Sequence, residues 1–153
     1  MNLLVRKKNG AQIYIDIAHN PDALKNILEA MKEQMKNTNG KLFVLFGCEG
    51  ERDKEKRPLM GEIANKLADV VFITDDNPRN ENPEEIRNEI FQACKKAYNI
   101  SGRENAIKKA FNMLGENDVL ILAGKGHEKF MIIKEKEIPF DEKKIIRECI
   151  GNE

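Results

Sequence analysis

The sequence predicts a single α/β domain built on a mostly parallel β-sheet flanked by helices. Short, continuously apolar runs alternate along the chain with segments whose apolar residues recur at helical spacing. This alternation is typical of successive strand and helix units that lie side by side in one sheet. The length of 153 residues suits one ordinary domain, and no linker, low-complexity tract or internal repeat divides it.

The chain first shows an alternating strand and then a capped helix. Isoleucines at alternate positions of residues 13–17 indicate the strand. Asn20 and Pro21 provide an N-cap and a first-turn proline for the helix, which we expect Gly40 to close. The apolar face of this helix consists of Leu24, Ile27, Leu28, Met31 and Met35.

Continuous apolar runs then mark strands that are buried on both faces of the sheet. The runs cover residues 42–46, 70–73 and 119–122. Residues 130–133 and 137–138 are expected to form a terminal hairpin. Helical patterns fill the remaining intervals, from about Pro58, from the N-cap Asn82, through Ile107 as far as Gly115, and after the N-cap Asp141.

Composition argues against several classes of function. Lysine and arginine together number 26, as do aspartate and glutamate, so no global field attracts nucleic acid or an anionic membrane. No stretch approaches the ~18 apolar residues of a membrane span, and we expect a cytoplasmic protein. Cys48, Cys94 and Cys149 lie far apart without metal-ligand spacing, which indicates free thiols and no metal site.

Four polar loops follow the predicted parallel strands, where ligands of open α/β sheets bind. Taken singly, each has a structural explanation. The Asp76-Asn77-Pro78 sequence is typical of a turn, and residues 51–57 look like a solvated charged loop. A lone His19 or a Gly-Lys-Gly sequence is also weak evidence. Together, however, they place both histidines and several charges on one edge: residues 16–21, 47–54, 75–79 and 124–128.

The charged residues of these loops indicate a zwitterionic ligand. Arg52 and Arg79 each offer a forked donor set to a carboxylate, and Glu128 or Asp76 can accept from an ammonium group. Asp16, His19 and Lys125 suit the neighbourhood of a phosphate or a metal-bound nucleotide, without one base standing out. Signatures of a phosphate-binding P-loop, a dinucleotide-binding loop, a nucleophile elbow and a zinc protease are all missing.

The motifs of these loops, in their order, resemble those of the MurE-type UDP-N-acetylmuramoyl-tripeptide synthetases. The resemblance is collinear from about Ile13 to Ile150 and covers only the last of the three domains of such enzymes. The matching motifs are Asp16-x-Ala-His19-Asn-Pro21, Phe46-Gly-Cys48, Arg52-Asp-Lys-x-Lys-Arg57-Pro-Leu-Met-Gly61, Asp75-Asp-Asn-Pro-Arg79 and Ala123-Gly-Lys-Gly-His-Glu128.

The resemblance implies a Rossmann-like α/β sheet and a role in cytoplasmic peptidoglycan biosynthesis. Residues 1–153 would be the amino-acid-binding C-terminal domain, without the N-terminal UDP-binding and central ATPase domains. The central domain would hold ATP and Mg and phosphorylate the D-glutamate carboxylate of UDP-MurNAc-L-Ala-D-Glu, so this domain alone is expected to be inactive. The acceptor would be meso-diaminopimelate or an isostere such as lanthionine.

The resemblance also assigns roles to individual residues. Asp16 and His19 would face the nucleotide across the domain cleft. The acceptor amino acid would be held by Arg52, Asp76, Asn77, Arg79, Gly124 and Glu128.

Three departures from the family pattern keep alternatives open. Ile17 stands where the family usually has an aromatic residue, and Glu49-Gly50-Glu51 replaces the usual Gly-Gly-Asp. Asn20 is more typical of folylpolyglutamate synthetases, which lack the DNPR loop of residues 76–79. The alternatives are therefore a ligase similar to these synthetases, or a stand-alone amino-acid-binding or interaction module.

Overall fold

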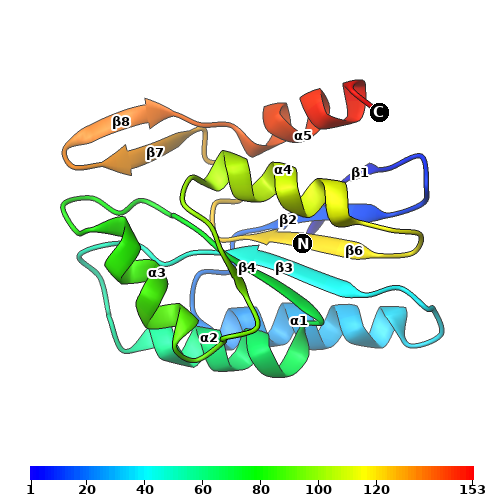
Figure 1. Ribbon diagram of the computed structural model, residues 1–153, viewed down its shortest axis with the longest axis horizontal. Helices are drawn as coiled ribbons and strands as arrows, with labels where there is room; N and C mark the ends of the chain where they lie inside the picture. The colour runs from blue at the N-terminus through cyan, green and yellow to red at the C-terminus, as the bar shows by residue number, and fades with distance from the viewer.

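The computed structural model describes residues 1–153 and contains a six-stranded sheet with a separate hairpin (Figure 1). The strand order of the sheet is β1-β2-β6-β3-β4-β5. Strand β1 is antiparallel to β2, and the other neighbours pair in parallel. The predicted mostly parallel α/β fold is thus confirmed. The strands are β1 Asn2–Arg6, β2 Gln12–Asp16, β3 Leu42–Phe46, β4 Val70–Ile73, β5 Tyr98–Asn99 and β6 Val119–Ala123, with hairpin strands β7 Phe130–Ile133 and β8 Lys136–Pro139.

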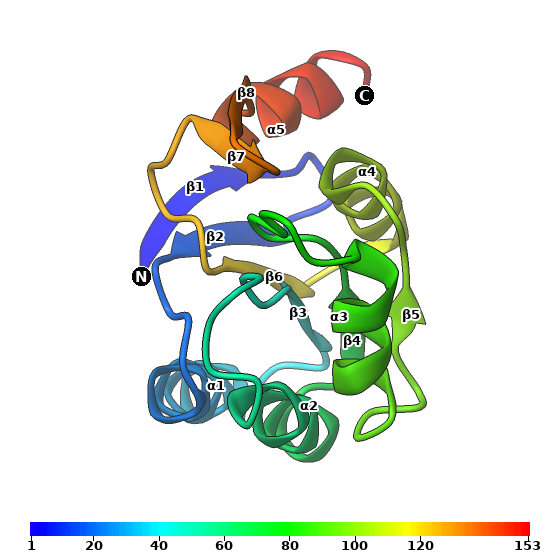
Figure 2. The same cartoon turned by 90° about the vertical axis from the view of Figure 1, so that its left-hand side faces the viewer.

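Five helices cover the two faces of the six-stranded sheet. Figures 1 and 2 show α1 and α2 beneath the sheet, with α4 and α5 above it. The five helices include no candidate for a membrane-spanning segment. The helices are α1 Pro21–Met35, α2 Lys56–Leu67, α3 Pro83–Phe91, α4 Arg103–Met113 and α5 Glu142–Gly151.

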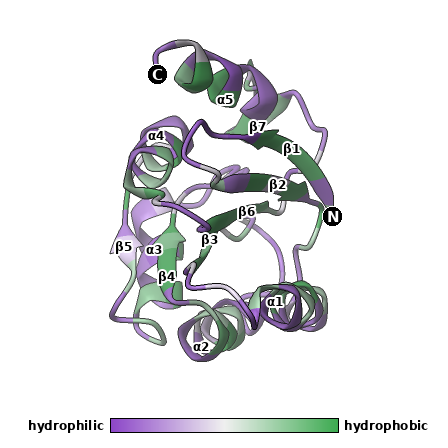
Figure 3. Cartoon of the chain, turned by 90° about the vertical axis from the view of Figure 1, so that its right-hand side faces the viewer, coloured by the Kyte–Doolittle hydropathy of each residue, from purple (hydrophilic) through white to green (hydrophobic).

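The continuous apolar runs arise because the central strands are sandwiched between helical layers. Along β3, Val44 and Phe46 belong to the core formed with α1, α2 and α3, whereas Phe43 and Leu45 belong to the core formed with α4 and α5. Successive side chains of a strand point to opposite faces, so a strand covered on both sides is apolar at every position. Figure 3 shows β3, β4 and β6 as hydrophobic, while the helices combine hydrophobic and polar residues.

The predicted helix starts are confirmed where a side chain caps the first turn. Asn20 accepts a hydrogen bond from the backbone amide of Ala23, Asn82 accepts one from Glu84, and Asp141 accepts from Lys143 and Lys144. Each cap satisfies amides that would otherwise lack a partner in the first turn. The local sequence therefore determines where α1, α3 and α5 begin.

Gly40 does not close α1, contrary to the prediction, because the helix ends at Met35. A Cβ atom at Gly40 would lie 1.8 Å from the carbonyl oxygen of Asn117. The residue is a glycine because the connection into β3 passes directly against the backbone of the loop that enters β6. Its role is close packing between two connections that are distant in sequence.

The three cysteines are free thiols, with Cys48 and Cys94 in the core and Cys149 partly buried. Cys48 packs against Met60, with 3.7 Å between the two sulfur atoms. Burial raises the pKa of the Cys48 thiol to about 12. Cys48 is therefore a core residue that stays protonated at neutral pH, although it lies within a candidate ligand loop.

Candidate functional site

The candidate site lies at the carboxyl edge of the parallel strands, where the structure brings the four polar loops together. The loops follow β2, β3, β4 and β6, which pair with one another in parallel. Two backbone hydrogen bonds of 3.0 Å join them in pairs, from Gly124 to Asp16 and from Gly50 to Asn77. The predicted gathering of these loops on one edge is confirmed.

Glycines allow these loops to pack backbone against backbone. A Cβ atom at Gly50 would lie 1.9 Å from the carbonyl oxygen of Pro78, and one at Gly47 would lie 2.3 Å from that of Thr74. Gly124 has a φ of 113° and leaves room for the carboxylate of Asp76, which a Cβ would approach to 2.9 Å. Gly124 therefore contributes space and backbone geometry to the site.

Arg52 and Arg79 come from different loops and flank the carboxylate of Glu49. Glu49 Oε2 lies 3.6 Å from Arg52 Nε, and Glu49 Oε1 lies 4.0 Å from an Arg79 guanidinium nitrogen. Arg52 is 56% exposed and Arg79 is 23% exposed. The buried Nε atom of Arg79 has no hydrogen-bond partner. The exposed parts of the two guanidinium groups can therefore offer donors to a carboxylate that approaches from solvent.

The position of Arg79 is fixed by its backbone. Its amide donates to the carbonyl of Ile132, and its carbonyl accepts from the amide of Lys134, at 3.1 and 2.6 Å. These bonds attach the loop after β4 to the hairpin strand β7. The residue adopts a φ of 55°, a conformation that is uncommon for a side chain of this size. The hairpin thus holds Arg79 in place at some conformational cost.

Lys125 joins the loop after β4 to the loop after β6. Its buried ammonium group donates to Asp76, Asn77 and Glu128 at 3.3, 3.1 and 3.4 Å. The sequence places Lys125 among residues that suit the neighbourhood of a phosphate or a metal-bound nucleotide, and in the structure its ammonium group is enclosed by these three acceptors. Lys125 balances the buried Asp76 carboxylate and holds Glu128.

Asp76 and Asn77 are buried, and the side chain of Asn77 forms hydrogen bonds with residues of two other loops and of β7. The Asn77 side-chain oxygen accepts from Lys125 and from the backbone amide of Ile132, and its amide group donates to Glu49 at 2.8 Å. These partners occupy the amide oxygen fully, since a carbonyl oxygen has two lone pairs. Of the residues predicted to hold the ligand, Arg52, Arg79 and Glu128 remain the most accessible, and Glu128 is 43% exposed.

Asp16 and His19 lie on the loop after β2, at the same edge of the sheet. One oxygen of Asp16 accepts from the amide of Ala18 at 2.7 Å, so the carboxylate shapes the turn. The exposed ring of His19 lies 3.0 Å from the carbonyl of Ile17, and Lys56 donates to the backbone carbonyl of His19. His19 is thus exposed at the rim of the site, whereas the other oxygen of Asp16 lies 3.0 Å from the N-terminal ammonium group of Met1. Both residues lie on the side away from Arg79 in strand order.

Sequence reasoning missed the structural role of Arg57, which lies in a charged run that, taken singly, is typical of a solvated loop. Its side chain is fully buried and makes two parallel hydrogen bonds to Glu81, at 3.0 and 2.9 Å. It also donates to Glu89 and to the backbone carbonyl of Glu49. Arg57 therefore anchors the loop that carries Glu49 and Arg52 to the segment that leads into α3. No local pattern reveals this role, because Glu81 lies 24 residues away.

The pairing with Arg57 predicts an acid-dependent loss of stability. Hydrogen bonds from Arg57 hold the pKa of Glu81 at about 2, below its ordinary value of 4.5. A carboxylate with a lowered folded pKa stabilises the fold above its unfolded pKa, and this stability is lost as pH falls from about 4.5 toward 2. Glu81→Gln should therefore reduce the change in unfolding free energy between pH 6 and pH 3 by about 1–2 kcal/mol.

Urea unfolding of the chain at both pH values measures this effect. Glu116→Gln, which alters an exposed carboxylate in the loop before β6, serves as the control and should titrate like the wild type. Parallel losses of stability in wild type and Glu81→Gln would contradict the assignment.

Sequence reasoning also missed Arg103 and Arg87, two arginines that form hydrogen bonds with Asp75 in the loop after β4. Arg103 and Glu142 form a buried ion pair of 2.7 Å, and Arg103 also donates to the carbonyls of Asp75 and Ala123. Arg87 pairs with the Asp75 carboxylate at 2.5 Å. These contacts fix the ends of β4 and β6, from which the candidate ligand residues extend.

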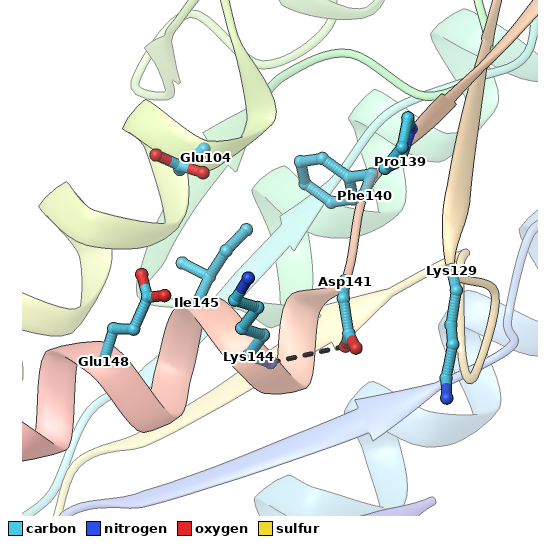
Figure 4. Close-up of a pocket in the computed structure, with 8 residues that line it drawn as sticks. All are labelled: Glu104, Lys129, Pro139, Phe140, Asp141, Lys144, Ile145 and Glu148. Atoms are coloured by element: carbon cyan, nitrogen blue, oxygen red, sulfur yellow. Dashed lines mark hydrogen bonds between the residues drawn. The ribbon is translucent and has the colours of Figure 1, made fainter.

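A cavity of about 400 Å³ lies away from these ligand residues, between the end of β8 and helices α4 and α5 (Figure 4). Its lining carries charges of both signs, from Lys129 and Lys144 and from Glu104, Asp141 and Glu148. Figure 4 shows Asp141 turned toward the first turn of α5, where it caps the helix. None of the residues predicted to bind a ligand lines this cavity.

The residues of the candidate site do not fit a magnesium nucleotide by themselves. No group of three or more His, Cys, Asp or Glu side chains is placed to hold a metal ion. Lys125 is enclosed by its own acceptors, and no P-loop sequence is present. The arrangement fits a small zwitterion, with guanidinium donors on one side and an accessible carboxylate on the other.

Comparison with known proteins shows a match to one protein family and to several ligases. The model of the family described as "Mur ligase, glutamate ligase domain" matches residues 1–126. The chain is 49% identical over 151 residues to a UDP-N-acetylmuramoyl-L-alanyl-D-glutamate–2,6-diaminopimelate ligase of Rhizobium meliloti, covering 99% of this chain and 30% of the relative. A ligase of the same name from Clostridium acetobutylicum is 50% identical over 140 residues, covering 90% of this chain and 28% of the relative. The chain thus spans about 30% of the length of these relatives.

Among solved structures, a ligase of the same name is also similar to this chain. A UDP-N-acetylmuramoyl-L-alanyl-D-glutamate–2,6-diaminopimelate ligase superposes with a TM-score of 0.90 at 34% identity, covering 99% of this chain and 31% of that chain. A bifunctional folylpolyglutamate synthase/dihydrofolate synthase from Yersinia pestis gives a TM-score of 0.59 at 19% identity, covering 79% and 27%. The second likeness is one of fold alone.

Proposed function

The chain belongs to the family of Mur ligase glutamate ligase domains, and from this membership we propose that it is the acceptor-binding domain of a MurE-type ligase. The ligase would add meso-diaminopimelate, or an isostere with the same distal head group, to UDP-MurNAc-L-Ala-D-Glu in cytoplasmic peptidoglycan biosynthesis. Relatives that are about half identical to this chain carry the name of this ligase. Their greater length supports the proposal that the chain acts together with further domains.

One observation carries this proposal more than any other. Two guanidinium groups, from Arg52 and Arg79, converge on one carboxylate, and Glu128 presents an accessible carboxylate on the loop after β6. Such a set of charges is complementary to a head group that has both a carboxylate and an ammonium group. The distal end of meso-diaminopimelate is a head group of this kind.

We assign the candidate residues two kinds of role. Arg52 and Arg79 bind the distal carboxylate, and Glu128 accepts from the distal ammonium group. Asp76, Asn77 and Gly124 hold these residues in position, because the first two are engaged with Lys125 and the third provides space for Asp76. Because the domain binds the distal end of the diamino acid, the amino group at the opposite end of the acceptor stays free to react.

ATP and magnesium belong, in this proposal, to a domain outside the 153 residues. Asp16 and His19 would face that domain, since they lie on the rim formed by the loop after β2. The residues of this chain then bind and orient the acceptor and contribute no phosphate-binding loop. We accordingly propose that the chain alone performs no turnover.

A chimera tests the proposed function. This chain would replace the matching segment of the Rhizobium meliloti ligase, and phosphate release dependent on both the precursor and meso-diaminopimelate would be measured. We expect acceptor-dependent phosphate release in the chimera and its loss in the Arg79→Ala version. The same host with its own segment reinserted at the same junctions is the control.

The chimera also separates the alternatives. If the control is active and the folded chimera uses no diamino acid, the chain is a binding or interaction module rather than a ligase domain. If the chimera instead transfers glutamate, the folylpolyglutamate synthetase alternative gains support.

A further inference from the structure

Glu49 is the one acidic side chain of the loop after β3 that contacts both candidate ligand arginines. Its two oxygens lie 3.6 Å from Arg52 Nε and 4.0 Å from a terminal nitrogen of Arg79. Asn77 donates to Glu49 at 2.8 Å and thereby directs the carboxylate toward the arginines. The chain thus places a carboxylate of its own between the two groups that are best suited to bind a ligand carboxylate.

These contacts are loose compared with a well-formed arginine–carboxylate pair. Direct charged hydrogen bonds are about 2.7–2.9 Å long, and guanidinium groups prefer two parallel bonds to one carboxylate. Arg57 and Glu81 form such a pair in this same structure, whereas Glu49 does so with neither Arg52 nor Arg79. The buried Nε of Arg79 has no acceptor at all. The terminal nitrogens of Arg52 and Arg79 make no direct hydrogen bond within the chain, so a better-placed carboxylate can use them.

We propose that Glu49 is a specificity-determining residue that acts as an internal competitor for the ligand carboxylate. Glu49 occupies Arg52 and Arg79 while the site is free, and a ligand binds by displacing it from Arg79 with a carboxylate of better geometry. This inference rests on the proposed function for the identity of the ligand. The competition itself concerns only the residues of this chain.

The charge of Glu49 sets the size and sign of the expected effect. A negative charge about 4 Å from Arg79, at a partly exposed site, weakens binding of a second carboxylate by roughly tenfold. Glu49→Gln removes this charge, yet its side-chain oxygen still accepts from Asn77. A ligand with a distal carboxylate should bind more tightly to this variant, whereas lysine, which has only an ammonium group at that end, should gain nothing.

Glu51→Gln is the matched control. Glu51 lies on the same loop, but its carboxylate accepts from Asn80 and contacts neither ligand arginine. The control removes the same charge from the same loop, so it accounts for long-range electrostatic effects. Differences between Glu49→Gln and Glu51→Gln then report on the contacts with Arg52 and Arg79.

A titration of the 153-residue chain tests the competition without any assumption about its ligand. Sodium acetate is added to ¹⁵N-arginine-labelled wild type, Glu49→Gln and Glu51→Gln at constant ionic strength, and the arginine Nε resonances are followed. We expect saturable shifts of Arg79 and Arg52 in Glu49→Gln, with a dissociation constant about tenfold lower than in the other two proteins. Equal constants in all three, or equal shifts of all arginines, would overturn the proposal.

Kinetics of the chimera described above connect the competition to acceptor choice. Glu49→Gln should lower the KM for meso-diaminopimelate about tenfold and leave the KM for L-lysine unlowered. Equal changes for both acceptors would show that Glu49 has a merely structural role. A wild-type chimera that uses no diamino acid would refute the proposed function, and the acetate titration would still decide whether Glu49 competes.

Discussion

Replacing Arg79 by alanine is expected to abolish a preference of about a hundredfold or more for meso-diaminopimelate over L-lysine. Diaminopimelate ends in a second amino-acid head group, whose carboxylate can accept two bonds from one guanidinium. Lysine has only an ammonium group at that end and would face Arg79 as a like charge. Arg79 is about three-quarters buried and held by β7, so it cannot simply turn away into solvent.

The magnitude follows from typical energies. A charge-assisted pair contributes about 1.5–3 kcal/mol, and a buried charge left unpaired costs roughly 2–5 kcal/mol. At about 1.4 kcal/mol per decade, these values correspond to at least a hundredfold in kcat/KM. The measurement is acceptor kinetics in the chimera, with wild type, Arg79→Ala and Arg79→Lys compared.

Arg79→Lys is the informative control because it keeps the charge and removes the planar fork. We expect it to retain part of the preference, whereas Arg79→Ala should lose nearly all of it. Equal use of lysine and diaminopimelate by the wild-type chimera, or an unchanged preference in Arg79→Ala, would contradict the assignment.

Arg103→Met is expected to destabilise the chain by about 3–5 kcal/mol at pH 7, because it leaves a buried carboxylate unpaired. Glu142 is almost fully buried, and Arg103 is the partner of its Oε2 atom. The substitution also removes the donors to the carbonyls of Asp75 and Ala123 at the ends of β4 and β6. Urea unfolding followed by circular dichroism measures the loss.

A double variant separates loss of the charge partner from loss of packing. Arg103→Met combined with Glu142→Leu removes both charges, so most of the lost stability should return. A loss below about 1 kcal/mol in Arg103→Met, or a double variant that is no more stable than the single one, would show that the ion pair does not hold the helices α4 and α5 together.

The predictable part of the fold is the part that local sequence encodes. Strands buried on both faces gave continuous apolar runs, and the caps Asn20, Asn82 and Asp141 marked the helix starts. Strand β5 was missed because it has only two exposed residues, and β1 was missed because it is an edge strand without full burial. Such strands are defined by pairing with a neighbour, which local periodicity does not show.

The gathering of the four polar loops was predictable, but the contacts between their side chains were not. Parallel strands bring their carboxyl ends together, so the polar loops after them could be placed on one edge. The contacts of Lys125 with Asp76, and of Glu49 with Arg79, join residues 49 and 30 positions apart, and nothing in the local sequence shows them. Charged side chains that look solvated in the sequence can therefore be internal supports, as Arg57 is.

The most direct test of the proposed function is a crystal structure of the active chimera with meso-diaminopimelate bound. We predict that the distal carboxylate lies on the Arg79 guanidinium in place of Glu49, and that Glu128 accepts from the distal ammonium group. Lys125 should keep its contacts with Asp76 and Asn77. A ligand whose distal head group contacts neither Arg79 nor Glu128 would contradict the account.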